Sequence, residues 1–97
     1  MVYGQKVVGK KAQKLVQKGA LLIDVRSPVA FRDGTLPGAV NMSLRQLSQL
    51  ATKAKTTPVI VFGDSDDDPT LKSALNYIEL YGFNAVYSLG AKDNWEK

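Results

Sequence analysis

Three short runs of apolar residues set the strongest constraint on how this chain folds. They cover residues 20–25 (ALLIDV), 59–62 (VIVF) and 85–89 (AVYSL), and segments with helical periodicity separate them. Runs of this length are too short for helices, and an uninterrupted apolar run is typical of a strand buried on both faces. Strands that alternate with helices form parallel sheets covered on both sides. We therefore expect a three-layer α/β/α fold with a central, mainly parallel sheet.

Two of the helical segments carry clear end signals. The first helix is expected at about residues 10–18, where Gly19 stands at the position of a left-handed C-terminal cap. The last clear helix is expected to begin after Asp68 as the N-cap, with Pro69 at its first position and Gly82 at its end. The apolar faces of these helices are Val8, Ala12, Leu15 and Val16 in the first, and Leu71, Ala74, Leu75 and Ile78 in the last.

The segment between the first two apolar runs is expected to hold smaller elements. Residues 28–32 fit a short helix, and residues 36–39 (LPGA) fit a turn. A further amphipathic helix is expected after that turn. Its apolar positions are Leu44, Leu47, Leu50, Ala51 and Ala54.

Length and composition limit the chain to one domain. Ninety-seven residues with 44% apolar content suffice for a single core, so we expect one domain over residues 1–97. The sequence contains no apolar run approaching the roughly 20 residues of a membrane-spanning helix, and its start lacks the apolar block of a signal peptide. We expect a cytoplasmic protein that does not associate with membranes.

The chain contains neither cysteine nor histidine. This excludes disulfides, thiolate nucleophiles, imidazole bases and the usual zinc ligands. Only carboxylates, hydroxyls and amines remain as reactive side chains, and the sequence predicts no metal site and no cofactor.

Charge is distributed unevenly along the chain, whose net charge is +4. Residues 1–23 contain five lysines and no acid, whereas four aspartates fall within residues 64–68. The lysines of the expected helix at 10–18 come without an arginine or an aromatic residue, so a solvated helix face is favoured over nucleic-acid binding. The folded surface should carry one basic and one acidic patch. The lysines are Lys6, Lys10, Lys11, Lys14 and Lys18.

Two segments are candidates for a functional site. Ligands of open α/β sheets bind beyond the carboxyl ends of the strands. Residues 24–27 and 63–68 follow the first two apolar runs directly. Any site should therefore be built from these two segments.

The sequence around the first run resembles the signature of rhodanese-like domains. That family has a buried strand, Asp-x-Arg, a short helix and then Gly-His-Ile-Pro-Gly-Ala-x-Asn. Here residues 22–31 read LIDVRSPVAF and residues 34–41 read GTLPGAVN. The resemblance continues through the second run, residues 81–83 (YGF), residues 86–90 (VYSLG) and Trp95, so it covers nearly the whole chain.

The chain departs from the family pattern at its active-site loop. The family's catalytic cysteine, which carries sulfur as a persulfide, aligns with Gly63. The loop that follows reads DSDDDP at residues 64–69, where the family usually has glycine and arginine. Two smaller departures, Ala30 in place of Glu and Thr35 in place of His, stand at positions that the resemblance implies to be structural. The resemblance therefore implies a degenerate domain with a vestigial loop made of Gly63, Asp64, Ser65, Asp66, Asp67 and Asp68.

Two catalytic interpretations of the loop are less favoured: Ser65 as a substitute nucleophile, and a loop of the phosphatase type. Ser65 has no histidine to activate its hydroxyl, and a serine oxygen cannot form a persulfide. The loop is also about two residues longer than the sulfurtransferase type, as in related phosphatases and arsenate reductases, but those need a cysteine and an arginine as well. An anion that approached this loop would meet up to four carboxylates, each repelling it by about 1 kcal/mol at ~4 Å in water.

The aspartates also alternate like the opening of a calcium loop. Pro69 stands where such a loop needs glycine, and Leu75 stands where it needs a bidentate glutamate. A solvated loop whose last aspartate caps a helix is the favoured interpretation.

Asp24, Arg26 and Trp95 have both a structural and a functional interpretation. Asp24 and Arg26 are spaced like a catalytic pair, but a charge pair at a strand end more often stabilises local structure. Trp95 is more typical of a lid on the core than of a ligand platform. The structural interpretation is favoured for all three.

Two hypotheses about function follow. The first is a non-catalytic interaction or regulatory module that presents residues 64–68 to a protein partner with a basic surface. The second is a divergent sulfurtransferase, or a phosphatase-like enzyme, in which a partner supplies the missing nucleophile. The absence of cysteine favours the first.

Overall fold

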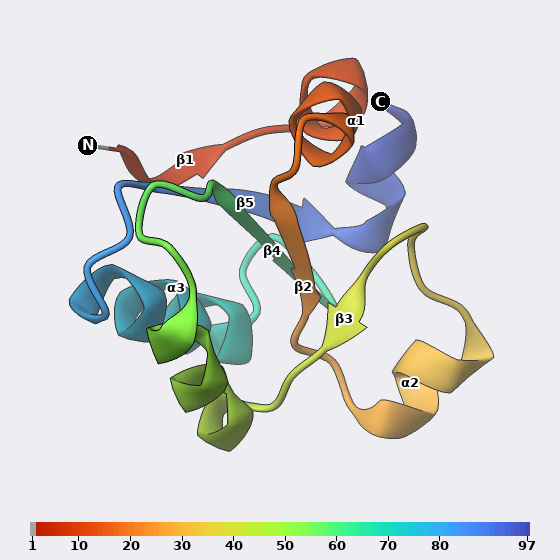
Figure 1. Ribbon diagram of the computed structural model, residues 1–97. Coiled ribbons are helices and arrows are strands. Elements are labelled where there is room, and N and C mark those ends of the chain that lie inside the picture. Colours follow the sequence, from red (N-terminus) through yellow and green to blue (C-terminus); the bar gives the residue numbers. More distant parts are fainter. Residues whose placement is uncertain (1) are drawn as a thin grey trace.

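The computed structural model describes residues 2–97, with side chains from residue 4 onward. These residues form a five-stranded parallel sheet with helices on both faces (Figure 1). The strand order is β1-β5-β4-β2-β3, which places β4 at the centre. The predicted three-layer α/β/α fold is confirmed. The strands are β1 (Val2–Lys6), β2 (Leu21–Asp24), β3 (Val40–Asn41), β4 (Val59–Gly63) and β5 (Ala85–Ala91).

The two edge strands, β1 and β3, have no apolar run and were not expected from the sequence. β1 reads VYGQK, and β3 has only two residues. An edge strand is solvated along one side, so it does not need the continuous apolar sequence of a central strand. Pairing with β5 and with β2 defines these strands.

The side chains of β4 alternate between two cores. Val59 and Val61 pack on one face, which is covered by α3 (Pro69–Leu80) and the 3₁₀ helix η1 (Leu44–Thr52). Ile60 and Phe62 pack on the other, which is covered by α1 (Gly9–Gln17) and the short 3₁₀ helix η2 (Lys92–Glu96). Figure 1 shows these two helical layers on opposite sides of the sheet. Trp95 belongs to the second core with 8% exposure, as expected of a lid.

The predicted helix ends are confirmed. The side chain of Asp68 accepts a hydrogen bond from Thr70 N, and Pro69 is the first residue of α3. Gly19 and Gly82, which follow α1 and α3, have φ of 106° and 93°. The short helix α2 (Pro28–Asp33) begins after Ser27, whose hydroxyl accepts from Ala30 N at 3.1 Å.

The amphipathic helix expected after the turn is a 3₁₀ helix instead. In η1, Leu47 and Leu50 are buried, whereas Ala51 is exposed and Ala54 is exposed beyond its end. Residues three apart align in a 3₁₀ helix, so leucines spaced by three form the buried side and Ala51 falls off it. The expectation that both alanines belong to the apolar face was wrong.

Within residues 2–97, no helix has both the length and the apolar character that crossing a bilayer demands.

Candidate functional site

The two candidate segments meet at the carboxyl edge of the sheet. β2 and β4 are parallel neighbours, and Asp24 pairs with Phe62 in their register. Gly63 and the loop of residues 64–68 therefore begin beside the end of β2. The side chain of Arg26, which follows β2, reaches over Phe62 of β4, and its guanidinium carbon lies 5.6 Å from the centre of the Phe62 ring.

Asp24 is a fully buried carboxylate that holds the end of β2. It accepts hydrogen bonds from Arg26 Nε and Nη2 at 3.1 and 2.9 Å and from the Arg26 backbone N at 2.9 Å. Thr35 Oγ1 donates to the same carboxylate at 2.9 Å. Thr35, which the sequence resemblance aligns with the family's histidine, thus supports the buried Asp24 carboxylate. These contacts fix the turn that follows β2.

Arg26 extends this network to the chain beyond α2. Its Nη2 donates to Gly34 O at 2.6 Å. The hydrogen bond to Asp24 raises the pKa of Arg26 above its ordinary value, and the charges of Asp24 and Asp64 act in the same direction against the effect of burial. Asp24 and Arg26 are thus bonded to each other and to the local backbone.

Gly63, which the sequence resemblance aligns with the family's cysteine, lies directly against the Asp68 side chain. A Cβ at this position would lie 2.5 Å from Asp68 Oδ2 and 3.2 Å from Leu71 Cβ. Contacts under about 3.0 Å are not found for real Cβ atoms. The place where a catalytic side chain would begin is therefore occupied by the carboxylate of Asp68.

The Asp68 carboxylate also binds backbone N–H groups at both ends of the loop. Its Oδ2 accepts from Asp64 N at 3.0 Å, and its Oδ1 accepts from Thr70 N at 2.9 Å. A loop that precedes a helix in this way favours an anion at its centre. Here the chain's own carboxylate takes that position.

Asp66 anchors the outer part of the loop to two other segments. Its Oδ1 accepts from Ala91 N at 3.1 Å and from Asn94 Nδ2 at 2.9 Å, and its Oδ2 lies 2.6 Å from Lys6 Nζ. The hydrogen bond from Lys6 lowers the pKa of Asp66 below its ordinary value of 3.8, and the bonds from Ala91 and Asn94 add to this effect. The loop is thereby tied to β1, to the end of β5 and to η2.

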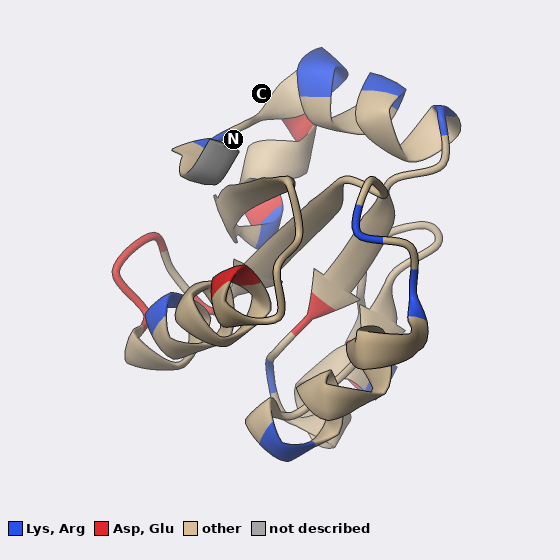
Figure 2. Ribbon diagram, turned by 60° about the vertical axis from the view of Figure 1, so that its left-hand side comes forward, with Lys and Arg blue, Asp and Glu red and all other residues tan. Residues whose placement is uncertain are grey.

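The remaining loop residues, Asp64, Ser65 and Asp67, are exposed. Figure 2 shows acidic residues gathered in the loop before α3, apart from the lysines of α1. Of the four carboxylates expected to face an approaching ligand, those of Asp66 and Asp68 are already bonded within the fold. Asp64 and Asp67 carry the exposed charge of the loop that the bonds to Lys6 and to the backbone do not engage.

The aspartates do not converge on a common point. Across the described residues, no group of three or more carboxylates is arranged to hold a metal ion. The calcium-loop alternative therefore has no cage of ligands in this part of the chain.

Three residues of this site were missed by sequence reasoning. Lys6 was counted only as part of the basic segment, and Asn94 was not singled out. Gly90 was noted only within the family motif, although a Cβ there would collide with Asp66 Oδ1 and lie 2.9 Å from Asn94 Nδ2. An amide beside Trp95 gave no chemical signal, because its partner is a loop far away in the sequence.

The fold and the site together define the class of protein. The chain is a parallel α/β domain whose candidate site is the loop between its central strand and the next helix. The family model of the rhodanese-like domain matches residues 9–97, and the chain belongs to this family. The resemblance stated from the sequence is confirmed.

Individual relatives agree with this assignment. The chain is 30% identical over 96 residues to the thiosulfate sulfurtransferase GlpE of Pseudomonas syringae pv. syringae, covering 94% of this chain and 86% of that protein. Among solved structures, a rhodanese-like domain of the Alr3790 protein from Anabaena sp. superposes with a TM-score of 0.64 at 27% identity, covering 74% and 83% of the two chains. A rhodanese from E. coli shares the fold, with a TM-score of 0.68 at 22% identity over 78% and 91% of the chains.

Proposed function

We propose that this rhodanese-like domain is a non-catalytic binding module that presents the loop of residues 64–68 to a protein partner with a basic surface. One observation carries the proposal: the Asp68 carboxylate occupies the space that a side chain at residue 63 would need, and the sequence resemblance aligns the family's cysteine with this residue. Sulfur transfer through a persulfide needs a thiolate, and the chain has no cysteine.

The loop has the rigidity that a recognition surface benefits from. Asp68 ties its start to α3, and Asp66 ties its outer part to Lys6 and Asn94. A surface that is already ordered loses less conformational entropy when it binds. These bonds support a binding role, because they order the backbone of the loop that carries the exposed Asp64 and Asp67, and because the Asp68 carboxylate takes the place of a substrate anion.

The charge of the loop supports a basic partner. Asp64 and Asp67 are exposed on a chain whose net charge is +4, so the loop is a local exception to the overall sign. Complementary charge steers partners into register and increases association rates more than it adds affinity. A basic surface on the partner is the chemistry that fits this loop.

Catalysis is tested with the family's own substrates. The purified domain is incubated with thiosulfate and cyanide, and thiocyanate is measured together with the intact mass of the protein. We expect no thiocyanate above the buffer background and no gain of bound sulfur. Product formed by the domain alone would support the divergent sulfurtransferase and refute the binding module.

Binding is tested with charge-matched variants. Asp64→Asn with Asp67→Asn removes the exposed loop charges, whereas Glu79→Gln with Glu96→Gln removes two exposed charges elsewhere. Each variant is used as bait for affinity capture, and bound proteins are identified at two salt concentrations. We expect a basic partner that the loop variant loses and the control retains. Equal capture by both variants would place the interface elsewhere.

A further inference from the structure

An open groove of about 330 Å³ lies between α1 and the edge strand β1. Segments from the start of the chain form most of its wall, and Tyr87 of β5 completes it. Its lining residues are Gln5, Lys6, Val7, Lys11, Lys14, Leu15, Lys18 and Tyr87.

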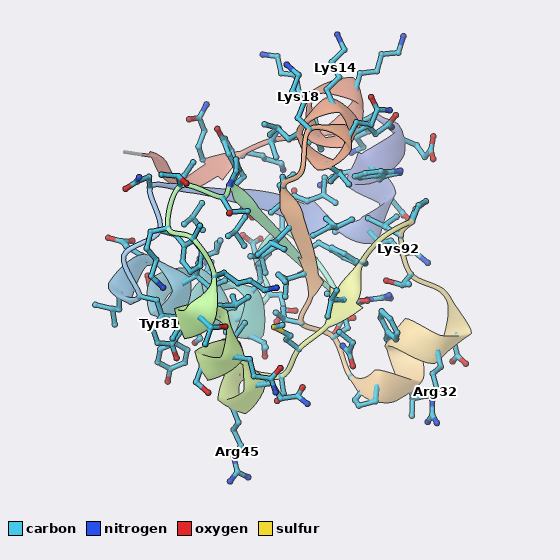
Figure 3. The ribbon with its side chains drawn as sticks, in the orientation of Figure 1. Lys14, Lys18, Arg32, Arg45, Tyr81 and Lys92 are labelled. Atoms are coloured by element: carbon cyan, nitrogen blue, oxygen red, sulfur yellow. The ribbon has the colours of Figure 1, made fainter. Side chains whose placement is uncertain are left out.

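The groove combines an apolar floor with a cationic rim. Val7 is buried and Leu15 and Tyr87 are half-buried, so apolar surface lies recessed between longer side chains. Lys14 and Lys18 extend from α1 away from the body of the molecule (Figure 3). Such lysines keep their ammonium groups in water while their stems border the apolar surface.

The charge of this rim is not neutralised by its own helix. Residues 1–23 contain no acid, so Lys11, Lys14 and Lys18 have none beside them in sequence. In the described part of the chain, the ion pair found at the groove is that between Lys6 and Asp66. The groove therefore offers a concentrated positive potential to a ligand.

Successive lysines of the rim lie closer together than alternate side chains of an extended chain, but their long, flexible side chains can cover the difference of about 1–2 Å. From Lys11 to Lys14 and from Lys14 to Lys18, an α-helix rises by about 4.5 and 6 Å. In an extended peptide, side chains on one face recur about every 6.6–6.8 Å. A segment in which acidic and apolar residues alternate would place carboxylates near successive lysines and apolar side chains on the floor.

Other anionic partners fit the groove less well. Single-stranded nucleic acid is held by aromatic stacking and by arginine, but the described lining contains only a half-buried Tyr87 and no arginine. A membrane surface requires apolar side chains that protrude, whereas Val7 and Leu15 are recessed.

We propose that the groove binds an extended acidic segment of a partner protein, in which apolar residues alternate with aspartate or glutamate. This surface borders the loop at Lys6, which pairs with Asp66, and its other lysines are opposite to the loop in charge.

The proposal is tested by fluorescence anisotropy on the intact domain. The probe is a short fluorescein-labelled peptide in which glutamate alternates with leucine, and the control peptide has glutamine in place of glutamate. Lys14→Glu with Lys18→Glu reverses two rim charges. Lys10→Glu with Lys53→Glu makes the same change in net charge at exposed residues that do not line the groove. Circular dichroism establishes that all variants are folded.

We expect the rim variant to bind the acidic peptide at least about tenfold more weakly than the parent, and the control variant less than about twofold more weakly. The glutamine peptide should bind poorly to all three proteins.

Equal losses in the two variants, or equal binding of both peptides, would overturn the proposal. Tighter binding of an oligothymidine strand or of phosphatidylserine vesicles than of the peptide would also overturn it. So would self-association of the domain that disappears in the rim variant, because the occupant would then be a second copy.

Discussion

Lys6 and Asp66 are 60 residues apart in the sequence, yet their side chains meet in an ion pair with 2.6 Å between Nζ and Oδ2. Both side chains are about half exposed, at 54% and 50%, so water and salt screen their attraction. The ion pair therefore contributes more to the position of the loop than to the stability of the fold. With the bonds from Ala91 and Asn94, it joins β1, the loop, the end of β5 and η2 at one carboxylate.

Replacement of Asp66 by asparagine should make the fold less sensitive to acid. Folding lowers the pKa of Asp66, chiefly through the hydrogen bond from Lys6. Such a group contributes stability above its ordinary pKa, and this contribution is lost as the pH falls through the folded value. We expect Asp66→Asn to reduce the slope of unfolding free energy against pH below about pH 5. Urea denaturation across the acid range measures the slope, with exposed Asp67→Asn as the control. Identical slopes in the two variants would contradict the expectation.

A cysteine at position 63 should not create a sulfurtransferase. Gly63→Cys places a Cβ 2.5 Å from Asp68 Oδ2, so the carboxylate or the strand must shift. We expect a loss of about 1–3 kcal/mol in unfolding free energy and no mass gain after thiosulfate treatment. Adding Asp68→Ser shortens the obstructing side chain and keeps a cap, so it should recover part of the stability. A single variant that is as stable as the parent and binds sulfur would refute the steric argument.

Removing the Asp68 side chain should cost more than removing its neighbour. Asp68→Ala deprives Thr70 N and Asp64 N of their acceptor, and losing a cap of this kind typically costs about 1–2 kcal/mol. Asp67→Ala removes an exposed aspartate and should change stability by no more than about 0.5 kcal/mol. Urea denaturation of both variants at neutral pH gives the comparison. Equal effects would mean that the cap contributes little.

The close approach of Asp66 to Gly90 predicts a difference between two glycine substitutions. Gly90 and Gly38 have similar φ values of 82° and 80°, but a Cβ at Gly38 meets nothing within 4 Å. Gly38→Ala should therefore cost about 1–2 kcal/mol from its backbone conformation alone. Gly90→Ala should cost about 1–3 kcal/mol more, because the new Cβ collides with Asp66 Oδ1. Thermal unfolding with calorimetry ranks the pair, and a milder effect at Gly90 would count against the geometry of this contact.

The Asp24 network should be the most sensitive part of the site. Asp24→Ala leaves the guanidinium of Arg26, which is 10% exposed, without its buried partner. Breaking one side of a buried pair typically costs about 3–5 kcal/mol. Asp33→Ala at the exposed end of α2 provides the control, with an expected change within about 0.5 kcal/mol. A loss under about 1 kcal/mol for Asp24→Ala would show that Arg26 finds compensation elsewhere.

The central strands, the ends of α3 and the missing thiol were determined by the sequence itself. An apolar run such as residues 59–62 can be satisfied only between two cores, and it becomes the central strand β4. Asp68 and Pro69 start a helix through bonds to nearby backbone, so the signal lies within a few residues. The loss of the family's cysteine is a matter of composition.

Tertiary structure alone decided which charges are free and which spaces are filled. Sequence reasoning gave the loop four similar aspartates, but the fold turns Asp68 over Gly63 and Asp66 toward Lys6 and Asn94. Strand pairing also makes an edge strand of β1, whose sequence has no apolar run, and a groove forms between β1 and α1. Helix caps depend on residues that are neighbours in the sequence, and buried strands depend on apolar content, which the pattern of apolar residues shows directly. Side chains that meet across the sheet depend on the pairing of distant strands, and no local pattern encodes that pairing.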